Sequence, residues 1–169
     1  MEQQSIPDLE QSVIEEKDYY ESYLGDNAEY YMKRFERIDD GATVIFNVYA
    51  FFLGFFWLSY KKMYVEAMII FLVITAIEFI IPENSGVDRI FSILCSVTMG
   101  CFANYLYYKK VIRVVEKTRE KYSDDDQTSQ MDVLNILYNK GKPDWIIFIA
   151  IFVVLVSLII LGIILPNEY

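Results

Sequence analysis

Apolar residues gather in three long runs along the chain, and polar segments separate these runs. They cover residues 63–81, 90–108 and 145–165, so each holds 19 to 21 residues. An α-helix needs about 20 mainly apolar residues to cross the hydrocarbon core of a bilayer. A proline directly follows the first and the third run, and proline does not continue a helix. The pattern therefore predicts an all-α integral membrane protein with three transmembrane helices.

A fourth apolar segment, residues 42–60, is shorter and unusually aromatic, with eight aromatic side chains between residues 46 and 60. At helical spacing both of its faces are apolar, so lipid or other helices must cover it. Basic residues flank it on both sides, with Lys61 and Lys62 directly after it. Because basic residues at the ends of membrane segments favour the cytoplasm, we expect this aromatic block to be a re-entrant or interfacial helix, bent at Gly54. A fourth transmembrane helix is the alternative.

The segment before the block, residues 1–41, is acidic and rich in tyrosine. Its first 40 residues hold 12 Asp and Glu against 4 Lys and Arg. Apolar positions at helical spacing predict short amphipathic helices over residues 7–24 and 28–38, with Asn27 as the N-cap of the second. The net charge of the chain is −9, which argues against nucleic-acid binding because that function needs a basic surface. We interpret residues 1–41 as a cytosolic tail attached to a membrane domain, residues 42–169.

The second polar segment, residues 109–144, is basic where it leaves the second run. We expect a helix to continue from residues 90–108 into it, and a polar linker to follow over residues 123–129. Ser129 and Asp132 have the spacing of a capping box, which predicts the start of a short helix over residues 131–138. Eight of the 15 basic residues lie between residues 109 and 142, so this segment should face the cytoplasm. The loop at residues 82–89 and the carboxyl terminus then lie outside, and the amino terminus lies inside if the block does not cross.

Two stretches carry a resemblance to a known family. The first comprises Phe46-Asn47, Ala50-Phe51, Gly54, Trp57 and Tyr60-Lys61-Lys62-Met63-Tyr64, and the second comprises Gly100, Ala103-Asn104 and Tyr107-Tyr108. Together they resemble a bacterial family of small integral membrane proteins of unknown function, over residues 30–120. Some members of that family carry an amino-terminal zinc ribbon, whereas this chain has no cysteine before Cys95. The resemblance implies a multi-pass protein of the bacterial plasma membrane and implies no particular reaction.

Polar residues within the apolar segments are the candidate binding residues. An amide in an apolar block needs a hydrogen-bond partner, and Asn104 is a possible partner for Asn47. Glu78 lies inside the first run, where a carboxylate is a functional candidate by default; Arg89 is its alternative, structural partner. Glu66 is expected near the two lysines that precede it. The candidates for binding an unidentified ligand are Asn47, Trp57, Lys61, Lys62, Glu78 and Asn104.

Small and polar residues recur every four positions on one face of the second run. They are Ser92, Ser96, Gly100 and Asn104. Small residues let helices approach closely, so this stripe predicts a helix–helix contact, within the chain or between copies. A polar path across the membrane is the alternative.

The sequence offers no support for an enzyme. It contains no histidine, which removes the commonest general base and metal ligand, and none of the standard nucleotide-binding or hydrolase motifs occurs. Cys95 and Cys101 lie six residues apart in one apolar run and form no metal site. We expect no cofactor and a non-enzymatic protein that acts through contacts with a protein partner or with itself, with an immunity or accessory role as one form. A small oligomeric channel or transporter and a lipid-binding or envelope-stress protein are the alternatives.

Overall fold

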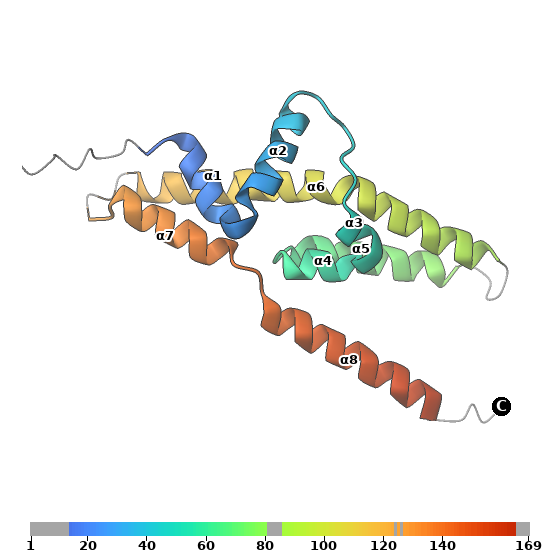
Figure 1. Cartoon of the computed structure of the whole chain (residues 1–169). Coiled ribbons are helices and arrows are strands. Elements are labelled where there is room, and N and C mark those ends of the chain that lie inside the picture. Colours follow the sequence, from blue (N-terminus) through green and yellow to red (C-terminus); the bar gives the residue numbers. More distant parts are fainter. Residues whose placement is uncertain (1–13, 81–85, 124, 126, 165–169) are drawn as a thin grey trace, which may run out of the picture.

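The computed structural model describes residues 14–80, 86–123, 125 and 127–164, and these residues form helices and no strand (Figure 1). The prediction of an all-α protein is therefore confirmed. In chain order the helices are α1 (Glu16–Leu24), the 3-10 helix η1 (Gly25–Asn27), α2 (Ala28–Asp39), α3 (Val48–Leu53), α4 (Phe55–Tyr60), α5 (Tyr64–Glu78), α6 (Val87–Tyr122), α7 (Gln130–Gly141) and α8 (Trp145–Ile164).

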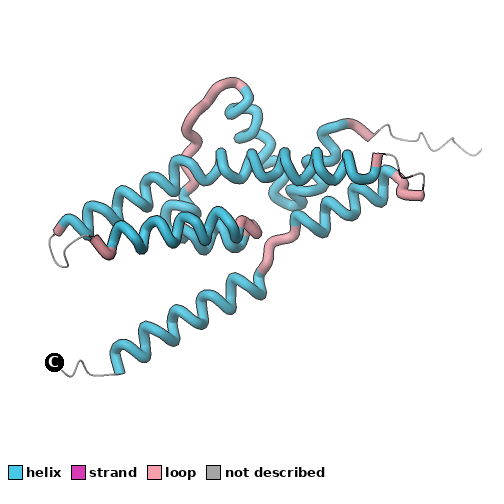
Figure 2. Tube along the Cα trace, turned by 180° about the vertical axis from the view of Figure 1, so that it is seen from behind, coloured by secondary structure: helices cyan, strands magenta, loops and turns pink. Residues whose placement is uncertain are grey.

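Helix α6 is the element around which the other helices are arranged. It runs without a break for 36 residues, so it is about 54 Å long. The prediction that the second apolar run continues into the basic segment is thus confirmed. Helices α1, α2 and α7 contact α6, and α3 contacts it nearer its amino end. Helix α8 begins against α4 and then diverges from the other helices (Figures 1 and 2).

Helices α1, α2, α7 and the second half of α6 pack together, and their buried side chains belong to one hydrophobic core that continues to Trp57 and Leu58 of α4. The side chains at its centre are almost fully buried, and they include Tyr23, Val111, Val115 and Leu137. The predicted amphipathic helix at residues 7–24 is observed as α1 from Glu16 onward, and residues 7–13 lie outside the described part of the chain. Asn27 immediately precedes α2 as predicted, but its side chain accepts no capping hydrogen bond.

The capping box predicted at the start of α7 is present. Ser129 Oγ accepts a hydrogen bond from the Asp132 amide at 3.2 Å, and the Asp132 carboxylate accepts one from the Ser129 amide at 3.0 Å. The helix is longer than predicted and ends at Gly141. At Gly141 the helix backbone approaches the backbone of Tyr23 so closely that a Cβ atom would overlap the Tyr23 carbonyl. This absence of a side chain allows α1 and α7 to pack.

The aromatic block is not one helix. Residues 42–47 have no regular structure, and two six-residue helices follow them, α3 and α4. Gly54 separates the two helices with a φ of +52°, a conformation that glycine adopts readily and that other residues avoid. The bend predicted at Gly54 is therefore present, whereas the prediction of one helix over residues 42–60 is wrong. The side chain of Asn47 caps α3 by accepting a hydrogen bond from the Ala50 amide.

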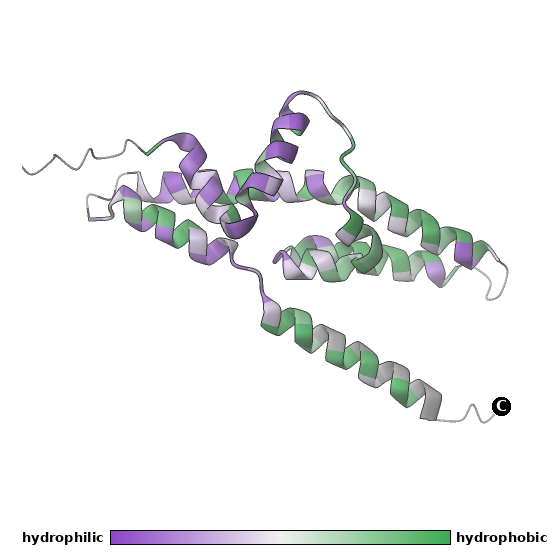
Figure 3. Cartoon of the chain, viewed as in Figure 1, coloured by the Kyte–Doolittle hydropathy of each residue, from purple (hydrophilic) through white to green (hydrophobic). Residues whose placement is uncertain are grey.

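The surface divides into an apolar part and a polar part. Exposed apolar side chains are frequent on α5, on the first half of α6 and on the described part of α8. Polar residues dominate α1 and α2 (Figure 3). By length and composition α6 is the one helix among the described residues that could cross a membrane. Helix α5 has 15 residues and ends three residues before the end of the first predicted run, residues 63–81. Helix α8 has 20 residues and lies within the third predicted run, residues 145–165.

Candidate functional site

Asn47 and Asn104 meet in the interior, as the sequence suggested. Both side chains are fully buried, and Asn47 Nδ2 donates a hydrogen bond to Asn104 Oδ1 at 2.8 Å. Asn104 Nδ2 donates to the carbonyl of Ile45 at 3.0 Å, and Asn47 Oδ1 accepts from the Ala50 amide at 3.0 Å. The two amides therefore fasten residues 42–47 and α3 to α6. They bind the chain to itself, so neither is a free group for a ligand.

Two of the four residues of the small-residue stripe, Gly100 and Asn104, pack against the aromatic block. The Gly100 carbonyl accepts a hydrogen bond from the Asn47 amide at 2.7 Å, and a Cβ at Gly100 would lie 2.6 Å from the ring of Phe46. Gly100 and Asn104 thus make the predicted close contact within the chain, against the aromatic block. Ser92 is exposed and donates to the Asp88 carbonyl of its own helix, and Ser96 is half-buried.

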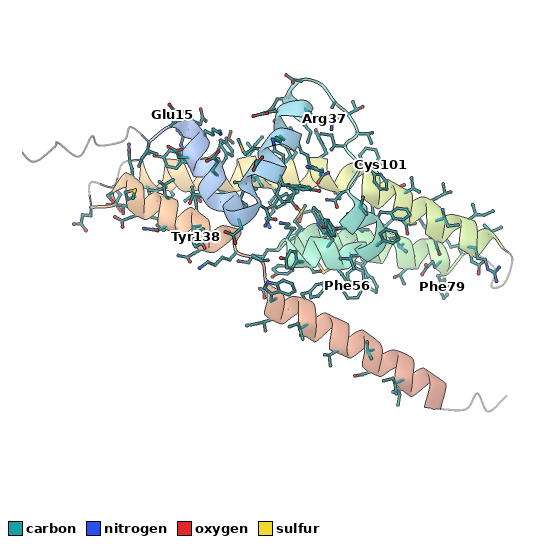
Figure 4. The ribbon with its side chains drawn as sticks, in the orientation of Figure 1. Glu15, Arg37, Phe56, Phe79, Cys101 and Tyr138 are labelled. Atoms are coloured by element: carbon teal, nitrogen blue, oxygen red, sulfur yellow. The ribbon has the colours of Figure 1, made fainter. Side chains whose placement is uncertain are left out.

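Lys61 lies in an aromatic box at the junction of α2, α4 and α6. Its Nζ is 4.5 Å from the ring centroid of Tyr31, 4.9 Å from that of Tyr107 and 5.6 Å from that of Tyr60. Trp57 is buried and packs edge-on against Tyr107. The electron-rich ring faces stabilise the ammonium group, while burial lowers the pKa of Lys61 to about 8. A cavity of about 290 Å³ borders this junction, and its lining includes Tyr31, Trp57, Tyr60 and Lys61. Figure 4 shows the side chains of the helices that surround it.

A basic pocket lies beside the aromatic box, between α6, α7 and the turn that follows α4. It is a cavity of about 720 Å³. Six basic side chains and one carboxylate, that of Glu120, contribute to its lining. The six are Lys62, Lys110, Arg113, Lys117, Lys121 and Lys140.

Three of the five lysines of this basic pocket donate to neutral oxygens rather than to carboxylates. Lys62 Nζ donates to the carbonyl of Lys140 at 3.2 Å, and Lys140 Nζ donates to Thr118 Oγ1 at 2.8 Å. Lys110 Nζ donates to the carbonyl of Lys61. Within the described part of the chain, three ion pairs occur, and none of them includes a residue of the pocket lining. Among the residues that the structure describes, no direct ion pair therefore neutralises the positive charge of the pocket.

Burial and neighbouring charged groups affect the pKa of Lys110 in this pocket. Burial lowers the pKa of Lys110 to about 8; the neighbouring ammonium groups of Lys62 and Lys61 lower it further, and Glu66 opposes them. Glu66 was predicted to meet Lys61 or Lys62, but the lysine whose pKa it influences is Lys110. It is within ion-pair distance of no described residue.

The structure leaves Glu78 apart from this site. It is the last residue of α5 and its side chain is exposed. Arg89 is exposed as well, and no ion pair joins the two among the described residues. The predicted structural pairing of Glu78 with Arg89 is therefore not observed. No group of three or more cysteine, aspartate or glutamate side chains that could hold a metal ion occurs in the described ranges.

The spacing of basic residues on α6 was a sequence signal for the pocket, but it was not strong enough to predict the pocket. Lys110, Arg113, Lys117 and Lys121 follow one another at steps of three, four and four residues, which places them on one face of α6. Nearby acidic residues on the same helix obscured this stripe. The partners from α7 and from the turn at Lys62 depend on tertiary packing, and sequence spacing does not reveal them.

Lys62 occupies a strained backbone position at the edge of the pocket. It is the one described residue other than glycine with a positive φ, which is +56°. We expect Lys62→Gly to raise the unfolding free energy by about 1 kcal/mol, because glycine removes the steric cost of this conformation. Thermal unfolding of the detergent-purified protein measures the effect. Lys62→Ala is the matched control: it removes the same side chain and keeps the strain, so equal stability of the two variants would contradict this explanation.

The fold and the site define an all-helical protein in which a buried amide pair holds an aromatic block against a long central helix. The chain belongs to the family described as protein of unknown function DUF2628, whose sequence model matches residues 12–113. The predicted membership in an uncharacterised family is thereby confirmed. No curated protein and no solved structure matches the chain. The matched range includes the amide pair, the aromatic box and three of the six basic residues of the pocket.

Proposed function

We infer that the protein is a non-enzymatic, multi-pass protein of the bacterial plasma membrane that acts through protein contacts of its cytosolic helices. The proposed spans are the three apolar runs at residues 63–81, 90–108 and 145–165, to which α5, the first half of α6 and α8 belong. Within the described residues α6 alone meets the length and composition needed to cross, so the other two spans rest on the sequence and on the exposed apolar surface. The observation that carries this inference is the division of the surface. Side chains such as Leu72, Ile90, Ile93 and Ile146 are 58% to 82% exposed, and they belong to the three predicted runs. Contiguous apolar surface of this extent needs a cover, and lipid provides one.

The packing of α1 supports an amino-terminal segment on the same side as residues 109–144. Arg119 on α6 donates to Glu16 on α1 at 2.9 Å, and Ser22 Oγ donates to the carbonyl of Leu134 on α7 at 2.7 Å. The aromatic block lies between α2 and α5, so both of its ends then face the cytoplasm. This favours a re-entrant block over a fourth transmembrane helix.

The depth of the block agrees with a re-entrant path. Its contact with Gly100 lies ten residues before Lys110, whose ammonium group donates to the carbonyl of Lys61, directly after the block. Ten helical residues span about 15 Å, which is half of a hydrocarbon core of about 30 Å. The block therefore enters to about the middle of the bilayer, turns at Gly54 and returns to the basic end of the span.

The amide pair explains how irregular backbone is tolerated at this depth. Non-helical backbone inside a membrane must be buried in protein and must have its polar groups satisfied. Residues 42–47 meet this requirement at two points, because the Ile45 carbonyl accepts from Asn104 and the Asn47 amide donates to Gly100. Asn104 is engaged in this way and Glu78 is exposed at the end of α5, so the two residues do not line a common path. The channel alternative gains no support from their positions.

Site-specific photocrosslinking in cells tests the proposed protein contacts. Met131 and Tyr138 expose their side chains on α7 and are the positions for the photoreactive residue. Phe79, which is 94% exposed at the apolar end of α5, is the control position that should face lipid. We expect discrete protein adducts from the α7 positions, with doubled mass if the partner is a second copy. Absence of any protein adduct from α7 would contradict the proposal.

A further inference from the structure

We propose that the basic pocket between α6 and α7 binds the phosphate group of an anionic ligand, either a phospholipid headgroup or a soluble phosphate ester. This inference goes beyond the proposed protein contacts and does not depend on them. Its first support is the balance of charge: six basic side chains and one carboxylate line the pocket, and no ion pair within the described residues neutralises the six. Phosphate oxygens would supply negatively charged acceptors in place of the neutral oxygens that Lys62, Lys110 and Lys140 contact.

The basic groups reach the pocket from three separate elements. Arg113 and Lys117 project from the same face of α6, and Lys62 and Lys140 approach from the turn after α4 and from α7. An arginine guanidinium can contact two phosphate oxygens at once, and lysines add point charges around them. The cavity of about 720 Å³ has room for a phosphate together with the glycerol or sugar that it carries.

The position of the pocket indicates how a ligand would reach it. Lys62 directly precedes the run at residues 63–81, and Lys110 follows the run at residues 90–108 by two residues. If these runs cross the bilayer, the pocket opens at the level of the phosphate groups of the cytoplasmic leaflet. A soluble phosphate ester would enter the same pocket from the cytosol and use the same basic groups.

The test compares two pairs of substitutions that remove the same charge. The test pair is Arg113→Gln with Lys117→Gln, both exposed within the pocket. The control pair is Arg37→Gln with Lys109→Gln, which are exposed and do not line it. Full-length protein in neutral detergent is titrated with phosphatidylglycerol or phosphatidylcholine and followed by native mass spectrometry. A second arm measures the thermal shift produced by glycerol 3-phosphate and by inorganic phosphate.

We expect wild type and the control pair to bind phosphatidylglycerol in preference to phosphatidylcholine, and the test pair to bind it roughly 30-fold more weakly. Equal ligand-free melting temperatures of the two pairs show that the difference is not one of folding. A thermal shift with glycerol 3-phosphate that the test pair loses, without selective lipid binding, supports the same site and assigns it to soluble phosphate esters. Equal binding by both pairs, or no binding of any of these phosphates by wild type, would overturn the proposal.

Discussion

Replacing Asn104 with alanine should destabilise the protein by about 3 kcal/mol, because it leaves two buried polar groups without partners. Asn104 accepts from Asn47 Nδ2 and donates to the Ile45 carbonyl, and both asparagine side chains are fully buried. A buried group that loses its only partner costs about 1–3 kcal/mol. Chemical or thermal unfolding of the protein in detergent measures the loss. We expect the aromatic block to become accessible to protease in the same variant.

Two further variants make this result specific. Asn135→Ala removes an exposed asparagine of α7 and should leave stability nearly unchanged. The double variant Asn47→Ala with Asn104→Ala should cost less than the sum of the single variants, because the two residues share a hydrogen bond. If Asn104→Ala unfolds at the same point as Asn135→Ala, the amide pair does not hold the block.

Gly141→Ala should destabilise the protein by about 2–3 kcal/mol, although alanine favours a helix over glycine by about 1 kcal/mol. The new Cβ would overlap the carbonyl of Tyr23, and a backbone atom cannot move aside as a flexible side chain can. Helix α1 must therefore shift away from α7. Unfolding in detergent gives the stability, and amide hydrogen exchange of residues 16–24 reports the loss of packing.

A control substitution at a nearby exposed position separates the effect of this steric overlap from the effect of helix propensity. Asn139 is exposed on α7, and Asn139→Ala should leave α1 in place and stability unchanged or slightly higher. If Gly141→Ala stabilises the protein by the amount that helix propensity alone predicts, α1 does not lie against α7 as described.

Local patterns in the sequence predicted those features that local forces determine. The continuity of α6 follows from its uninterrupted helical pattern, and the start of α7 follows from the spacing of Ser129 and Asp132. The partnership of Asn47 with Asn104 was predictable because a buried amide requires a partner and few polar residues were available.

Features that depend on tertiary packing were not predictable in the same way. Gly54 indicated a bend, but only its positive φ shows that two short helices replace one. The aromatic box combines Tyr31 with Tyr107, residues far apart in the sequence, around Lys61. The pocket likewise needs α7 to fold back along α6 before Lys140 can meet Thr118. Sequence spacing carries no information about which distant faces meet.

We propose that the aromatic block enters and leaves the membrane on the cytoplasmic side. Single cysteines at Asp26, Ser85, Gln127 and Asn167, in a background with Cys95 and Cys101 replaced by alanine, test it by labelling intact cells with a membrane-impermeant thiol reagent. Lysed cells control for thiol reactivity. We expect protection at Asp26 and Gln127 and labelling at Ser85 and Asn167. Labelling of Asp26 together with Ser85 would contradict it, because the block would then be a fourth transmembrane helix.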